Sequence, residues 1–255
     1  MAIVVDISRR TLIHGTGVIG ATMLPIASPA QEGGGHNDAS STPSTAADAR
    51  AAQQPTYLFF NSEEATFIEA AIARLIPKDD RWGGALEAGV ANYIDKQLAG
   101  AWGTGERLYR SGPWQPGTPS QGYQLSFTPA ELYRTALAAI NKALAQTPFA
   151  QMSADRQDKY LASLEQGGTD LGGVPSDVFF SHVWQSTLEG FFSDPVYGGN
   201  HNMISWRMIG FPGAYASYYE LVDKHGIKID RPPMSLAEDA NGHLLMDPGI
   251  PASSP

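Results

Sequence analysis

SDVFFSHVWQSTLEGFF, residues Ser176–Phe192, is the most apolar helical pattern in this sequence of 255 residues. Its apolar side chains recur at positions i, i+1, i+4 and i+5, which places them on one broad face of an α-helix. The residues on that face are Phe179, Phe180, Val183, Trp184, Thr187, Leu188, Phe191 and Phe192. No stretch shows the alternation of a half-buried β-strand beyond two or three residues. The sequence therefore predicts an all-α domain.

Five further segments have helical periodicity together with start or stop signals. They cover roughly residues 62–76, 85–99, 129–144, 153–167 and 213–225. We expect Ser62 to cap the first of these helices and Leu86 to lie on the apolar face of the second. Thr128 and Glu131 form a capping-box pattern at the start of the third. The six segments predict an irregular helical bundle between residues 57 and 229, with long loops rich in glycine, proline and aromatic residues.

The N-terminus, residues 1–30, has the pattern of a twin-arginine export signal. Ser8, Arg9 and Arg10 precede a mildly apolar stretch that is too short and too rich in glycine to span a bilayer. Small residues then lead up to Ala30, where we expect cleavage. The pattern predicts that the chain is carried folded by the twin-arginine translocase and resides in the periplasm.

Two further segments have a composition that does not support a packed core. Residues 31–56 hold almost no large apolar side chain, so we expect a disordered linker there. Residues 230–255 are polar and rich in proline, so we expect an extended tail. The predicted organisation is therefore signal, linker, helical domain at 57–229 and tail.

Composition excludes several kinds of chemistry. The chain has 17 Lys and Arg against 26 Asp and Glu, a formal net charge of −9, which argues against a nucleic-acid-binding protein. It contains no cysteine. Disulfides, thiolate-bound iron–sulfur clusters, c-type haem attachment and a thiol nucleophile are therefore ruled out.

Two loops carry the residue types that recur at protein–protein interfaces. The first, Gly100–Phe127, is rich in aromatic residues, and Trp114 is one of them. We expect these aromatic side chains to lie either on a partner or in the domain's own core. The second, Phe191–Tyr215, combines paired glycines with aromatic side chains and an arginine. It is interpreted as a recognition surface, with a rigid structural corner or a small-molecule pocket as alternatives. The candidate contact residues are Trp114, Asp194, Tyr197, Gly198, Gly199, Asn200, Trp206, Arg207 and Phe211.

A search for catalytic motifs finds no H-E-x-x-H, G-x-S-x-G, P-loop or EF-hand pattern. The alternative of a metal site rests on His182, Glu189, Asp194 and His201, whose spacing matches no known ligand pattern. We assign no catalytic, cofactor-binding or metal-binding residue in this chain.

The second loop and its flanks resemble a known family, the small subunit (subunit 3, or gamma) of gluconate 2-dehydrogenases. The similarity covers about residues 57–225. The stretches that carry it most specifically are Glu189–Phe192, Asp194-Pro195, Tyr197–Asn200 and Trp206–Gly213.

The resemblance implies a non-catalytic subunit that works with two partners. One is a large flavoprotein of the glucose–methanol–choline type, which carries FAD and oxidises a sugar or sugar acid. The other is a multihaem cytochrome c, which passes electrons to quinone, so that membrane contact is made only through the complex. The resemblance also implies a role in assembly, in stability and in export of the flavoprotein. Two other hypotheses remain open: a free-standing exported metalloenzyme, and a periplasmic ligand-binding helical module.

Overall fold

The computed structural model describes residues 56–115, 117–118, 121, 124–214 and 221–236. The chain divides into two units, Met1–Pro55 and Thr56–Pro255, and all the described residues belong to the second. The expected export signal with Ser8, Arg9 and Arg10 lies outside the described residues, as does the expected linker up to residue 55.

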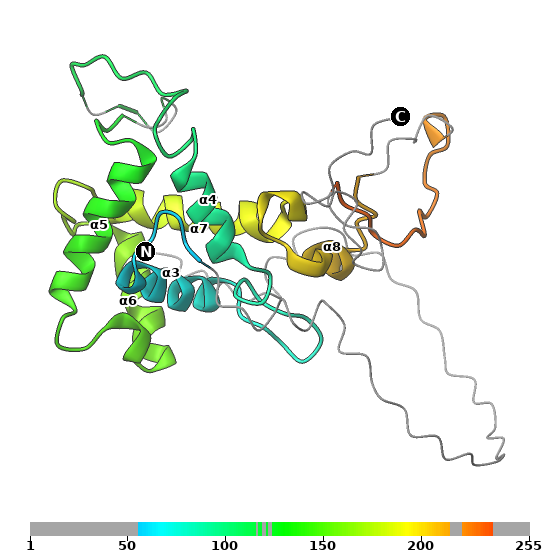
Figure 1. The fold of residues 1–255 in the computed structure, drawn as a ribbon, viewed down its shortest axis with the longest axis horizontal. Helices are drawn as coiled ribbons and strands as arrows, with labels where there is room; N and C mark the ends of the chain where they lie inside the picture. The colour runs from blue at the N-terminus through cyan, green and yellow to red at the C-terminus, as the bar shows by residue number, and fades with distance from the viewer. Residues whose placement is uncertain (1–55, 116, 119–120, 122–123, 215–220, 237–255) are drawn as a thin grey trace, which may run out of the picture. The chain divides into compact units, whose positions relative to one another are not determined.

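The described part of the chain is built from α-helices, and it contains no named strand (Figure 1). The all-α prediction is therefore confirmed. The described residues form six α-helices: α3 (Ser62–Leu75), α4 (Val90–Ala99), α5 (Pro129–Ala143), α6 (Ala154–Gln166), α7 (Ser176–Phe192) and α8 (Ile204–Ile209). Three short 3-10 turns accompany them: η2 (Phe149–Gln151), η3 (Pro195–Tyr197) and η4 (His201–Met203).

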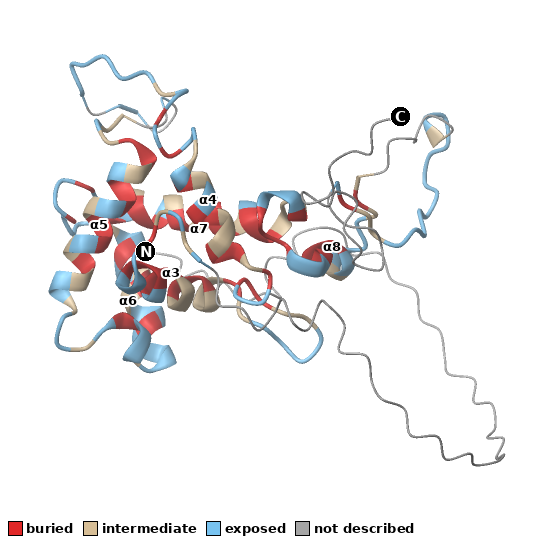
Figure 2. Cartoon of the chain, viewed as in Figure 1, coloured by how far each residue is buried: buried red, intermediate tan, exposed pale blue. Residues whose placement is uncertain are grey.

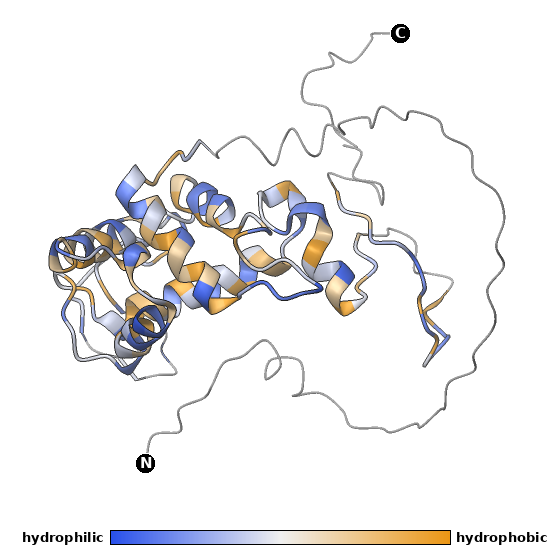
Figure 3. Ribbon diagram, turned by 90° about the horizontal axis from the view of Figure 1, so that it is seen from below, coloured by the Kyte–Doolittle hydropathy of each residue, from blue (hydrophilic) through white to orange (hydrophobic). Residues whose placement is uncertain are grey.

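Helix α7 lies at the centre of the bundle because its apolar face is too wide to be covered by one neighbour. It packs most extensively against α6 and α4, and it also contacts α3, α5 and α8. Phe179, Val183 and Phe191 of α7 are almost fully buried, and Figure 2 shows buried residues concentrated where the helices meet. The other helices carry both polar and apolar residues (Figure 3), as expected for elements with one face in water.

The helix starts follow capping chemistry. Thr128 and Glu131 form the expected capping box on α5, because each side chain accepts a hydrogen bond from the other residue's backbone N–H. Helix α3 has the same arrangement, but its N-cap is Asn61 rather than Ser62, and its reciprocal partner is Glu64. The prediction of Ser62 as the cap was wrong by one residue, since Asn61 is the residue placed to close the box.

Helix α4 is shorter than its apolar pattern predicts. It begins at Val90, not Ala85, because Gly89 precedes it in the left-handed conformation with φ of 72°. Residues 85–89 form a turn instead, and the N–H of Ala85 donates to the carbonyl oxygen of Ile76 over 2.8 Å. This turn directs Ala85 into the core and leaves Leu86 47% exposed, so Leu86 was wrongly placed on the apolar face.

The C-terminal helix expected at 213–225 is not seen where the structure describes that range. Gly213 and Ala214 form backbone contacts to Met234, and residues 221–224 form a turn rather than an α-helix. Residues 215–220 lie outside the described residues. The sixth helix of the described chain is α8, inside the segment that was expected to be a loop.

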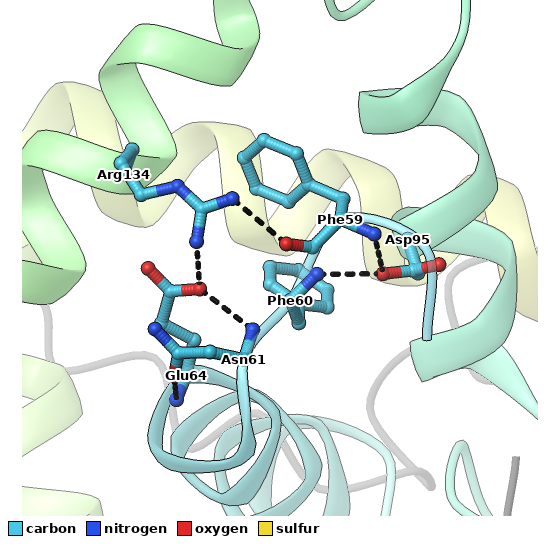
Figure 4. A network of polar contacts seen from close by, with 6 residues as sticks. All are labelled: Phe59, Phe60, Asn61, Glu64, Asp95 and Arg134. Atoms are coloured by element: carbon cyan, nitrogen blue, oxygen red, sulfur yellow. Dashed lines mark hydrogen bonds and ion pairs between the residues drawn. The ribbon is translucent and has the colours of Figure 1, made fainter. Parts of the chain in front are cut away.

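The start of the folded unit is held by a buried carboxylate. Asp95 of α4 is 1% exposed, and its oxygens accept hydrogen bonds from the backbone N–H groups of Leu58, Phe59 and Phe60 at 2.7–2.9 Å. Figure 4 shows the bonds from Phe59 and Phe60. Burying a carboxylate is costly unless it is hydrogen-bonded, and three donors meet that need. Residues 58–60, which we call the strap, precede α3 and are thereby fixed to α4.

Arg134 of α5 holds the same strap from the other side. It forms an ion pair with the buried Glu64 and donates to the carbonyl oxygen of Phe59 over 2.7 Å (Figure 4). Its guanidinium carbon also lies 4.1 Å from the centre of the Phe59 ring. The two networks join α3, α4 and α5 through one short stretch of backbone.

Candidate functional site

The segment from Asp194 to Gly213 is the candidate site, and it follows directly from the central helix. Asp194 begins it by accepting a hydrogen bond from the N–H of Val196 over 2.9 Å, which caps the turn η3. The chain then reverses at Gly198, where φ is 91°. The turn η4 and the short helix α8 follow, and Gly210 ends α8 with φ of 72°.

The backbone of this segment is strained. Asn200, Asn202 and Met203 have φ values of 47°, 54° and 52°, and they are the non-glycine residues with positive φ in the described part of the chain. Residues other than glycine adopt a positive φ at a cost of about 1 kcal/mol or more each, although asparagine tolerates it better than methionine. Such a conformation persists only where the surrounding contacts hold it, and it occurs most often at functional sites.

Asn200 supplies the main contacts that hold the strained turn. Its side chain is fully buried and donates from Nδ2 to the carbonyl oxygen of Ser193 over 2.9 Å. Its Oδ1 accepts from the backbone N–H of Ser205 at 3.0 Å and from the Ser205 hydroxyl at 2.8 Å. One side chain therefore joins the end of α7, the turn and the start of α8.

Further contacts fix the segment to the helical bundle. The indole N–H of Trp206 donates to the carbonyl oxygen of Phe192 over 3.0 Å. The N–H of His201 donates to the carbonyl oxygen of Ala88, and the Asn92 side chain donates to that of Gly198. The segment is thus bound to both α7 and α4.

Two glycines allow the close approach of these elements. A Cβ on Gly190 would lie 2.7 Å from the Tyr93 ring, so the crossing of α7 and α4 requires glycine there. A Cβ on Gly199 would overlap the carbonyl oxygen of Gly190. The backbone of the turn can therefore lie directly on α7.

The outer side of the segment exposes apolar and aromatic side chains. Val196, Tyr197, Ile209 and Phe211 are 44–54% exposed, and Arg207 is exposed beside them in sequence. We call these five residues the contact face. Phe211 also packs edge-on against Trp206, with ring centres 5.1 Å apart. Large apolar side chains on a rigid base, with an arginine, have the composition of an interface core.

The predicted contact residues fall into two groups. Tyr197, Arg207 and Phe211 are exposed and belong to the contact face. The remaining members of the segment support that face from below. Gly198, Gly199, Asn200 and Trp206 are buried, and Asp194 is half-buried.

Trp114 is not brought to this segment. Its loop lies at the end of the bundle away from α8 (Figure 1), although Trp114 itself is 39% exposed. Val196 and Ile209 are members of the contact face that the sequence did not single out. Both are ordinary aliphatic residues whose exposure depends on how the turn packs.

The metal-site hypothesis has no geometric support. No group of three or more His, Asp or Glu residues that could hold a metal ion is found in the described ranges, which include His182, Glu189, Asp194 and His201. The His182 ring instead lies 6.3 Å from the centre of a Trp102 ring, and burial lowers its pKa from the ordinary 6.5. The His201 ring lies directly over Gly89.

A hollow of about 550 Å³ lies beside α5, away from the contact face, and its lining includes Arg110, Glu131, Arg134 and Phe59. Its charged groups pair with one another or with the bundle. Arg110 lies 3.5 Å from Glu131, and Arg134 is held by Glu64.

No helix among the described residues is both long and apolar enough to cross a membrane.

Comparison with known proteins identifies the family. A family model described as gluconate 2-dehydrogenase subunit 3 matches residues 62–213. The matched range begins at the first residue of α3 and ends at Gly213, so it includes all six described α-helices and the contact face. Searches of curated proteins and of solved structures found no match. The match covers more than half of the chain and confirms the resemblance seen in the sequence motifs, so the chain belongs to the gluconate 2-dehydrogenase subunit 3 family.

Proposed function

We propose that this chain is the non-catalytic small subunit of a periplasmic FAD-dependent dehydrogenase that oxidises a sugar or sugar acid. Family membership makes the chain a subunit of a gluconate 2-dehydrogenase complex, which implies partner subunits. The proposal adds that one partner is a flavoprotein of the glucose–methanol–choline type. A multihaem cytochrome c would be the second, passing electrons to quinone at the inner membrane.

The observation that carries this proposal is the contact face. It exposes three large apolar residues and a tyrosine on a backbone that is strained and fastened by buried hydrogen bonds. A surface that is ordered before binding loses little conformational entropy when a partner docks. Exposed apolar side chains on such a surface favour a protein partner over water.

The cofactors of the complex are proposed to lie in the partners. The chain has no cysteine, so it offers no thiol for c-type haem attachment. Its G-x-G-x-x-G sequence, Gly15–Gly20, falls inside the expected export signal rather than in a strand–turn–helix unit. FAD is therefore assigned to the flavoprotein and haem c to the cytochrome.

The small subunit is further proposed to bring the flavoprotein through the twin-arginine translocase. The expected signal at residues 1–30 supports this, because that route carries folded cargo. A subunit that binds the flavoprotein after FAD loading would then export the pair together. Replacing both Arg9 and Arg10 by lysine is expected to retain both proteins in the cytoplasm.

The test is recovery of the complex from native membranes through a tag on the C-terminus. Wild-type chain is expected to bring down a flavin-containing protein and a haem c protein, identified by mass spectrometry and by their visible spectra. Phe211→Ser is expected to reduce recovered flavin roughly tenfold, as for loss of one well-packed aromatic anchor. Leu58→Ser is the control, because Leu58 is a 73% exposed aliphatic residue outside the contact face. A wild-type chain recovered alone and colourless would overturn the proposal.

A further inference from the structure

The segment Leu221–Leu236, which we call the arm, was expected to end a helix and begin a free tail. Its C-terminal part is instead fastened to the candidate site. The N–H of Met234 donates to the carbonyl oxygen of Pro212 over 3.2 Å, and the N–H of Ala214 donates to that of Met234 over 2.7 Å. Gly213 and Met234 form a β-bridge at this point. The base of the arm is therefore continuous with the end of the contact face.

Asp194 links the arm to the contact face a second time. Its Oδ2 accepts from the N–H of Leu236 over 2.9 Å, while its Oδ1 caps η3 beside Val196. Ser235, which lies between the anchored residues Met234 and Leu236, is 2% exposed. One carboxylate thus sets the position of the base of the arm relative to a residue of the contact face.

The rest of the arm is exposed and carries branched apolar side chains. Every residue from 222 to 232 is exposed, and Figure 2 shows this stretch in pale blue. Val222, Ile227 and Ile229 are 66%, 45% and 36% exposed. Leu221 and these three residues border a hollow of about 310 Å³ that is lined by residues of the arm alone. The apolar side chains of the arm therefore border a surface that none of the described helices covers.

We propose that the arm is a second contact element, which docks by its apolar side chains onto the same partner subunit as the contact face. The inference rests on the proposed function. Family membership implies a partner subunit, and the base of the arm directs the arm to it, because Met234 is hydrogen-bonded to Pro212 and Ala214, next to Phe211 of the contact face. The occupant is a partner surface with an apolar depression that accepts Val222, Ile227 and Ile229. Burying three aliphatic side chains gives such a contact its driving force.

The fixed base makes this docking possible at low entropic cost. A free tail would have to be ordered along its whole length on binding, whereas the arm is already held at Met234 and Leu236. Asp194 acts here as a positioning residue, because it touches the arm and η3 rather than the partner.

The experiment uses the full chain with a C-terminal tag, recovered with its partners from native membranes. Val222→Ser, alone and combined with Ile227→Ser, is compared with Leu58→Ser. Leu58 and Val222 are aliphatic and similarly exposed, at 73% and 66%. We expect the double variant to lower recovered flavoprotein roughly tenfold, with the melting temperature of the isolated chain unchanged. Leu58→Ser is expected to match the wild type.

A second measurement tests direct contact. A photo-crosslinking amino acid at position 227 is expected to give a covalent product with the flavoprotein, and the same probe at position 58 is expected to give none. Wild-type recovery by the double variant together with no product at 227 would overturn the inference. That result leaves the proposed function intact if Phe211→Ser still releases the flavoprotein. Failure of the wild-type chain to recover any flavoprotein would refute the proposed function itself.

Discussion

Asn200 is the residue whose replacement tests the construction of the site most directly. Its amide makes three hydrogen bonds inside a fully buried environment, to the Ser193 carbonyl, the Ser205 N–H and the Ser205 hydroxyl. Each such bond contributes about 1 kcal/mol to stability, and the two Ser205 groups left behind in Asn200→Ala remain buried without it. The lost bonds therefore amount to roughly 3 kcal/mol.

The backbone conformation adds a second contribution. Asn200 has φ of 47°, which alanine adopts at a cost of about 1 kcal/mol and glycine adopts freely. Asn200→Ala is thus expected to lower the free energy of unfolding by about 4 kcal/mol and Asn200→Gly by about 3 kcal/mol. Alanine normally stabilises a folded chain relative to glycine, so the predicted order is the reverse of the usual one.

The assay is thermal unfolding of the isolated chain, followed by circular dichroism. For a folded unit of this size, about 4 kcal/mol corresponds to a decrease in melting temperature of roughly 10 °C. Ser205→Ala is the matched control, because it removes only the hydroxyl bond and should cost about 1 kcal/mol. An Asn200→Ala variant as stable as the wild type would refute the role of the buried amide. An alanine variant more stable than the glycine variant would refute the left-handed turn.

Three further predictions concern the bundle. Asp95→Asn keeps the shape of the side chain but weakens three charge-assisted hydrogen bonds from residues 58–60. The free energy of unfolding measured in urea is expected to fall by about 3 kcal/mol. An unchanged urea midpoint would contradict this prediction. Gly190→Ala places a methyl group 2.7 Å from the Tyr93 ring and should lower the free energy of unfolding by about 1–3 kcal/mol in the same assay. An unchanged free energy of unfolding would show that α7 and α4 cross less closely than described. Burial lowers the pKa of His182 below 6.5, so the unfolded chain binds the proton more readily, and stability should fall as pH decreases from about 7 through the folded pKa. His182→Gln should remove that part of the pH dependence, and identical stability–pH curves for both proteins would contradict the assignment.

Local sequence signals succeeded where the chemistry of an element lies within a few residues. The start of α5 at Pro129, capped by Thr128, and both ends of α7 were predicted correctly, because a capping box and a continuous apolar face are short-range features. Helix α4 was predicted five residues too long, because its apolar pattern does not show that Gly89 takes a positive φ. The periodicity also continues through a turn whose alanines are buried by tertiary contacts.

The candidate site was located by sequence but not understood from it. Paired glycines and aromatic residues identified the segment from Asp194 to Gly213. They could not show that Trp206 is buried and Phe211 exposed, because both are aromatic residues in the same short stretch. Nothing in the composition of residues 230–236 indicated that Leu236 returns to Asp194, since a hydrogen bond from a backbone N–H to a carboxylate forty-two residues away leaves no local pattern.

Residue types and their spacing were enough to predict the helical class, the central apolar helix, the absence of cysteine chemistry and the family. Each of these depends on residue types at short spacings, which the chain carries whether or not it is folded. Packing of the folded chain was needed to show which side chains form the contact face, how the strained turn is held, and where the arm is attached. Those features depend on buried hydrogen bonds and close backbone approaches between distant segments, such as Asn92 to Gly198 and Leu236 to Asp194. Such contacts exist only once α4, α7 and the turn are packed together, because no single segment contains both partners.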